Sequence, residues 1–161
     1  MASFFVVHLA VLELVKYKKY NQAANAINKK IEDNPDISDK WYLIYSKILI
    51  KCYLELKNFN QCEVAIKNVF AKFGYLPYFV ECYIDLFKCQ RRCEDIMQYV
   101  DILINLTPTS VKAWTNKITA LLNLDRTRDA FKEIKKARMW INDDAIWELY
   151  LQKIHISKVK N

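Results

Sequence analysis

The apolar residues of this chain recur every three or four positions, the spacing of one face of an α-helix. In the segment 110–142, two such stripes meet at a polar turn around Asp125 and Arg126. The first stripe is Trp114, Ile118, Leu121 and Leu122, and the second is Ala130, Phe131, Ile134 and Ala137. Along the whole chain the pattern predicts helices at residues 4–17, 20–33, 38–57, 60–73, 77–89, 93–106, 110–123, 127–140 and 143–157.

Glycine and proline are scarce, with one glycine and three prolines among 161 residues. Glycine-rich phosphate loops, dinucleotide-binding turns and tight β-hairpins all need several glycines, because their backbones require positive φ angles or close approach. The composition therefore excludes those sites and favours long helices joined by short turns. With 53% hydrophobic residues, the chain is also too apolar for the disordered classes. Its length suits a single domain, residues 1–161.

Residues that stop helices lie between successive pairs of predicted helices. These breaks are Pro35, Gly74 with Pro77, and Pro108. Side chains that cap helix N-termini follow them, at Ser38, at Thr109 or Ser110, and at Asp143 or Asp144. The breaks divide the chain into helix pairs at 4–35, 38–74, 77–108 and 110–142, followed by a last helix at 143–157.

The apolar positions of the helix pairs repeat at a fixed interval. Ala130, Ile134 and Ala137 recur 34 residues upstream as Ile96, Val100 and Leu103, and after another 34 as Cys62, Ile66 and Val69. The first pair carries Ala23 and Ile27 at the same slots, but 39 residues upstream of the second pair. We therefore expect the helix that carries Trp41 to be about one turn longer than its equivalents.

This 34-residue pattern, with Trp114 near its start and Ala130 and Ala137 in its second helix, resembles the tetratricopeptide repeat (TPR). The resemblance covers roughly residues 4–157 and implies an all-α fold: a right-handed α-solenoid of about four TPR-like units with a C-terminal capping helix. Neighbouring units of such a fold stack because one helix pair cannot bury its apolar stripe alone. The chain departs from the family pattern at position 8, where Val11, Ile50, Ile84 and Ile118 replace a small residue.

The resemblance also implies a function, because TPR proteins usually bind a peptide or helix of a partner protein on their concave surface. The family pattern places on that surface Lys47, Lys51, Tyr78, Glu81, Asp85, Lys88, Lys112, Thr115, Asn116, Thr119 and Asn123. Asparagine and lysine there can hydrogen-bond a peptide backbone or a carboxylate. The alternative is a solvated face without a partner. The chaperone-tail clamp of the family is echoed only at Lys112 and Asn116, so a role as a chaperone cofactor is not expected.

The N-terminal helix is apolar on every side, whereas a terminal repeat normally turns a polar face to solvent. Its interface candidates are Phe4, Phe5, Leu9 and Leu12. We expect this helix to dock on another subunit, on a second copy of the chain, or on sequence missing from it. The alternative is that it folds back and leaves a modest exposed patch.

The chain is basic, with a net charge of +7 at pH 7. Lys132, Lys135, Lys136 and Arg138 form a cluster near the end of one predicted helix. This cluster gives an alternative function, an RNA-associated assembly factor that binds RNA or an acidic protein through this face. Such clusters are also commonly just solvated faces.

Catalytic and metal-binding patterns are weak. The two histidines, His8 and His155, lie at opposite ends of the chain, so neither suits a catalytic pair. Cys82, Cys89 and Cys93 lack the paired spacing and accompanying histidines of zinc sites, although a metal or redox domain remains a distant alternative. We expect a non-enzymatic scaffold or adaptor subunit without a cofactor. The odd number of cysteines and the lack of a long apolar run predict a cytoplasmic or nuclear, reducing location without a membrane span.

Overall fold

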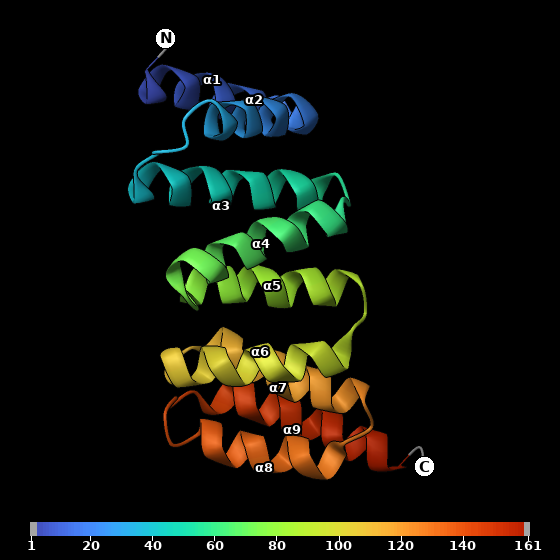
Figure 1. Ribbon diagram of the computed structural model, residues 1–161. Coiled ribbons are helices and arrows are strands. Elements are labelled where there is room, and N and C mark those ends of the chain that lie inside the picture. Colours follow the sequence, from blue (N-terminus) through green and yellow to red (C-terminus); the bar gives the residue numbers. More distant parts are fainter. Residues whose placement is uncertain (1–2, 160–161) are drawn as a thin grey trace. The chain divides into compact units, whose positions relative to one another are not determined.

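The computed structural model describes residues 3–159, with side chains as far as His155. Within this range the chain forms α-helices and no strand (Figure 1). The helices are α1 (Phe4–Lys16), α2 (Tyr20–Glu32), α3 (Asp39–Glu55), α4 (Phe59–Phe73), α5 (Pro77–Cys89), α6 (Cys93–Leu106), α7 (Val111–Asn123), α8 (Thr127–Ala137) and α9 (Asp144–Val159). None of these helices is both long enough and apolar enough to cross a membrane.

The chain divides into two compact units, residues 1–79 and 80–161, with the boundary inside α5. In the first unit, α1 packs on α2, α2 on α3, and α3 on α4. In the second unit, α6 packs on α7, α7 on α8, and α8 on α9. Neighbours in sequence are thus neighbours in space within each unit, as expected for stacked helix pairs.

The residues that recur in the sequence lie in the core. All four residues at the small-residue slot of the second helices are buried, and so are the four that follow them one turn later. These positions are Ala23, Cys62, Ile96 and Ala130, then Ile27, Ile66, Val100 and Ile134. The larger residues at position 8, Val11, Ile50, Ile84 and Ile118, are also buried, so the fold accommodates the departure from the family pattern.

Helix α3 has 17 residues, whereas α5 and α7 have 13 each. The difference of about one turn is the one predicted from the 39-residue step in the sequence. The extra length carries part of an aromatic cluster that holds the beginning of α1. The Phe4 ring stacks on Trp41 with their centroids 5.7 Å apart, and the Tyr45 hydroxyl donates a 3.0 Å hydrogen bond to the Phe4 carbonyl.

The turns inside the helix pairs share one backbone motif. Lys18, Lys57, Arg91 and Asp125 have φ angles between 55° and 57°, in the left-handed region that favours glycine. At each turn the N–H groups of this residue and of the next one bond back to the final turn of the preceding helix; for example, Arg91 donates to Lys88 and Arg92 to Phe87. This is the Schellman arrangement, which satisfies the last carbonyls of a helix. The sequence did not reveal these turns, because none of them contains glycine.

The helix boundaries agree closely with the predicted ones, and the largest difference is at α8. This helix ends at Ala137 instead of residue 140, because Met139 and Trp140 form tighter bonds to carbonyls three residues back. Their side chains are 74% and 54% exposed, so the apolar pattern that extended the predicted helix belongs to a surface turn. The structure also decides between the alternative caps: Ser110 caps α7, and Asp143 accepts a bond from the Ile146 N–H at the start of α9.

Helix α9, at the end of the second unit, is anchored in the same way as the first helix of a repeat. Trp147 is fully buried, and its indole N–H donates to the carbonyl of Ile141, six residues earlier. Trp114 of α7 makes the equivalent bond to Pro108, also six residues earlier. The predicted capping helix therefore covers the open side of the preceding helix pair with the same anchoring residue that the repeat itself uses.

Candidate functional site

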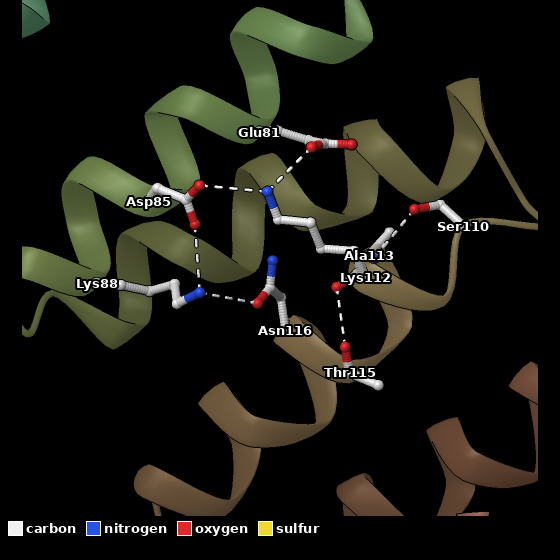
Figure 2. A network of polar contacts seen from close by, with 8 residues as sticks. All are labelled: Glu81, Asp85, Lys88, Ser110, Lys112, Ala113, Thr115 and Asn116. Atoms are coloured by element: carbon white, nitrogen blue, oxygen red, sulfur yellow. Dashed lines mark hydrogen bonds and ion pairs between the residues drawn. The ribbon is translucent and has the colours of Figure 1, made fainter. Parts of the chain in front are cut away.

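Five of the predicted groove residues form one polar network between α5 and α7 (Figure 2). Glu81, Asp85 and Lys88 share a face of α5 because they are spaced four and three residues apart, and Lys112 and Asn116 are spaced four apart on α7. The Lys112 Nζ lies 3.0 Å from Glu81 Oε2 and 3.2 Å from Asp85 Oδ2. The Lys88 Nζ lies 3.2 Å from the other Asp85 oxygen and 3.3 Å from Asn116 Oδ1.

The network balances its own charge, since it contains two carboxylates and two ammonium groups. Partial burial by itself would lower the pKa of Lys112, but the hydrogen bonds to Glu81 and Asp85 outweigh it and raise that pKa above its ordinary value. Lys112 is therefore held as a cation between two acids of the same unit. Its ammonium group is already engaged before any partner binds.

A groove lies beside this network in the second unit, with a volume of about 530 Å³. We call it the α7 groove; its lining residues are Lys88, Arg91, Cys93, Ile96, Asn116, Thr119, Ala120 and Asn123. Four of these, Lys88, Asn116, Thr119 and Asn123, are among the residues that the family resemblance placed on the binding surface. Their spacing along α7 puts Asn116, Thr119 and Asn123 on one helix face, above a floor formed by the buried residues Ile96 and Ala120.

A second hollow of about 300 Å³ adjoins the α7 groove, and both are lined by Thr119 and Asn123. The second hollow also involves Tyr150 and Lys153 of α9. The hydroxyl groups of Thr119 and Tyr150 lie 3.2 Å apart and form a hydrogen bond. The polar path along α7 therefore extends from the α5–α6 turn to α9.

The remaining predicted groove residues lie elsewhere. Lys47, Lys51 and Tyr78 belong to the first unit, where the Lys47 ammonium lies 4.8 Å from the centroid of the Tyr78 ring. Lys51 is exposed on α3. Thr115 is on α7, but its hydroxyl donates to the carbonyl of Lys112 one turn earlier.

Helix α1 is covered on one side and exposed on the other. Val11 is buried, and His8 packs edge-on against Trp41 with the ring centroids 5.5 Å apart. Phe5, Leu9 and Leu12 are exposed, together with Val6, whereas Phe4 lies in the aromatic cluster described above. Three of the four predicted interface residues therefore share an apolar surface, which we call the α1 face.

The lysine-rich cluster on α8 is less positive than its sequence indicates, because most of its cations lie beside acids. Lys132 is 3.4 Å from Asp129, Lys136 is 2.8 Å from Glu133, and Arg138 is 2.8 Å from Glu148. The Lys135 ammonium lies over the Phe131 ring, 4.8 Å from its centroid. Local acids thus offset much of the field that an RNA phosphate would encounter.

The five cysteines are free thiols, two of them buried. Cys62 fills its repeat slot in the core, as expected of a small hydrophobic residue, and burial raises the pKa of the Cys52 thiol. Within residues 3–155, histidine, cysteine and acidic side chains form no group of three or more that could hold a metal ion.

The polar lining residues that sequence reasoning did not place in this region are Arg91, Asp125, Thr127, Tyr150 and Lys153. The family pattern places binding residues on the first helix of each unit, whereas these residues lie in turns, at the start of α8 or on the capping helix. The basic character of Arg91 was visible in the sequence. Its position beside α7 depends on the left-handed turn, for which the sequence gives no glycine signal.

Comparison with known proteins gives matches in structure but not in sequence. No protein-family model and no curated protein sequence matches the chain. The solved structure of MamA RS-1, an ArsTM double mutant, has a TM-score of 0.78 at 7% identity and covers 96% of this chain and 84% of that chain. MamA AMB-1 has a TM-score of 0.68 at 14% identity, over 85% of this chain and 72% of that one. TTC0263, a thermophilic TPR protein in Thermus thermophilus, has a TM-score of 0.57 at 15% identity, over 97% and 83%.

At these identities the likeness concerns the fold alone. It agrees with the 34-residue recurrence of buried residues and with the helix pairs joined by equivalent turns. The chain has the fold of a TPR-like helical repeat protein.

Proposed function

We propose that the protein is a non-enzymatic scaffold that binds a segment of a partner protein in the α7 groove. The observation that carries this proposal is the position of Lys88, Asn116, Thr119 and Asn123, which the repeat pattern predicts to be binding residues and which line one groove. Its volume of about 530 Å³ is in the range of sites that enclose a ligand. The groove combines an apolar floor with amide and hydroxyl groups along its wall, which suits a peptide backbone.

The TPR-like fold supports the same proposal, since proteins of this architecture work by binding other proteins. A scaffold subunit also needs a place in its assembly, and the α1 face is the second contact surface that we propose. Apolar side chains gathered on one face of a terminal helix lose contact with water when another subunit covers them. The two surfaces then have different roles: the groove selects a segment, and α1 docks on a subunit, for which a second copy of the chain is one candidate.

Site-specific photocrosslinking tests the groove. A benzoylphenylalanine placed at Thr119 points a reactive group into the α7 groove, and the same residue placed at Lys132 on the outer side of α8 is the matched control. With extract of the natural host, we expect one adduct of defined mass at position 119 and none at position 132. The adduct should disappear when Asn116 and Asn123 are both replaced by alanine. Equal labelling at the two positions would contradict the proposal.

A further inference from the structure

The α7 groove has an unbalanced positive end. Its lining includes Lys88 and Arg91 but no acidic side chain. Lys88 is partly neutralised by Asp85, at 3.2 Å. Arg91 is exposed at the turn between α5 and α6, and within the described residues its guanidinium has no hydrogen bond or ion pair. A guanidinium carries several donors in a planar fork that fits a carboxylate.

Asn116 adds a hydrogen-bond donor beside these cations. Its amide oxygen accepts from the Lys88 ammonium at 3.3 Å, and Figure 2 shows the amide nitrogen turned away from that lysine. The reverse orientation would place two donors against each other, so the Lys88 contact fixes the orientation of the amide. The Nδ2 atom is buried and has no acceptor among the described residues. A buried donor without an acceptor is unfavourable, so a shift of the Asn116 side chain that brought this donor to a ligand oxygen in the groove would remove a penalty.

The length of the polar face limits what the groove can hold. Asn116 and Asn123 are seven residues apart on α7, which is about 10 Å along a helix. An extended peptide covers about 10 Å with three residues. The groove also does not stop at Asn123, because the second hollow shares Thr119 and Asn123 with it. A peptide therefore has room to continue past the groove towards α9.

We propose that the α7 groove takes an extended, acidic peptide segment and that Arg91 binds the carboxylate of an internal aspartate or glutamate. Asn116 and Asn123 bond the peptide backbone on either side of this residue. The continuation of the groove towards α9 favours an internal acidic side chain over a free C-terminus. This inference rests on the proposed function, since it names the chemistry of the segment that the scaffold binds.

Synthetic peptide arrays test the proposal with the whole protein. The probe is a set of random hexapeptides, printed both with free and with amidated C-termini. We expect the wild-type protein to select peptides with aspartate or glutamate at one internal position, whether or not the C-terminus is amidated. Replacing that acid by its amide should weaken binding about tenfold, the size of a hydrogen bond to a charged group.

The variant Arg91→Gln should bind the acidic peptide and its amide equally. Its matched control is Lys57→Gln, because Lys57 occupies the equivalent left-handed turn 34 residues upstream and lies outside the groove. That control should keep the tenfold preference. The reversed variant Arg91→Glu should instead select lysine or arginine at the same internal position, which a merely structural role of Arg91 would not produce.

The other outcomes separate the two proposals. This inference would be overturned if the protein selected peptides without an acidic preference, or if the acidic preference survived Arg91→Gln. In both cases the groove would still be a binding site. Binding that requires a free C-terminus would also overturn this inference. A folded protein that selects no peptide at all would overturn the proposed function of the groove for linear segments, and this inference with it.

Discussion

Lys117 is a largely covered cation that the structure pairs with two acids. Only 13% of its side chain is accessible, and its ammonium lies 2.7 Å from Asp101 of α6 and 2.9 Å from Glu133 of α8. Glu133 is similarly covered, with 11% exposed, and also binds Lys136 at 2.8 Å. These side chains join three consecutive helices of the second unit. The sequence did not single them out, because a lysine and a glutamate on separate helices show no pattern that links them.

The variant Lys117→Met should destabilise the protein by about 2 kcal/mol, because it removes one of the two cations that bind the largely covered Glu133. Urea unfolding followed by helical circular dichroism measures the loss. The control is Lys132→Met, which removes a 72% exposed lysine from its pairing with Asp129. That change should alter the free energy of unfolding by less than about 0.5 kcal/mol. Similar effects of the two substitutions would contradict a structural role for Lys117.

The same network predicts how stability depends on pH. Burial by itself would raise the pKa of Glu133, but the hydrogen bonds from Lys136 and Lys117 outweigh it and hold that pKa below its ordinary value of 4.5. Its contribution to stability is therefore fully present above pH 4.5 and is lost as the pH falls through the folded-state pKa.

The pKa of Lys117 has the opposite dependence. Burial by itself would lower it, but the bonds to Asp101 and Glu133 raise it above 10.5, so its contribution is present below pH 10.5 and is lost at higher pH. Glu133→Gln resembles the protonated acid. We expect it to be less stable than the wild type at pH 7, and the difference should shrink as the pH falls below 4.5, as measured by urea unfolding over a series of pH values. A difference that stays the same as the pH falls below 4.5 would argue against this assignment.

Among the helices and turns, the left-handed turn is the feature that repeats most regularly. Lys18, Lys57, Arg91 and Asp125 are separated by 39, 34 and 34 residues, the same steps that the apolar pattern shows. None of the four is glycine, although a side chain makes this conformation less favourable by about 1–2 kcal/mol. The helix packing on either side must therefore hold each turn in place.

Replacing Lys57 by glycine should stabilise the protein by about 1 kcal/mol, because glycine adopts the left-handed conformation without a steric cost. Thermal unfolding measures the change. The same substitution at Lys51, in the interior of α3, should destabilise by about 1 kcal/mol, since the residue there is helical. Destabilisation of the Lys57→Gly protein would mean that the side chain of Lys57 has a role that outweighs the strain of its backbone.

The fold was predictable from the sequence because the same pattern of buried positions is repeated along the chain. Each buried slot appears four times, so an atypical residue such as Cys62 does not hide the pattern. The end of α8 was not predictable, because Met139 and Trp140 continue the apolar pattern on the surface. The internal pairing of Lys112 was not predictable either, since it depends on which face of α5 lies opposite α7.

For the whole molecule, the two proposed binding surfaces differ in chemistry. The α1 face is apolar, so its contacts should tolerate salt, whereas carboxylate binding in the α7 groove should weaken as salt rises. The repeat positions identified four residues of the α7 groove in the sequence, and the apolar N-terminal segment identified three residues of the α1 face. The sequence could not show that Lys112 and Lys88 are already bound to acids, nor that Arg91 completes the groove.

If the α1 face joins two copies of the chain, Leu9→Ser should weaken their association about tenfold, because the leucine side chain loses its contact with the partner. Light scattering over a range of concentrations measures the association. Val64→Ser is the matched control, since Val64 on α4 is 51% exposed, as is Leu9. Equal effects of the two substitutions would exclude the α1 face as the contact. A wild-type chain that stays monomeric at every concentration would leave docking on a different subunit as the role of this face.

Binding of a partner segment in the α7 groove is the proposal on which the scaffold function depends. A nuclear magnetic resonance titration of the ¹⁵N-labelled protein, with the acidic hexapeptide that the arrays select, tests it at the level of single residues. We expect the backbone and side-chain amide signals of Arg91, Asn116, Thr119 and Asn123 to shift together and saturate, while those of α4 and of the outer side of α8 stay in place. Shifts centred on α4 or α8, with the α7 signals unchanged, would contradict the proposal.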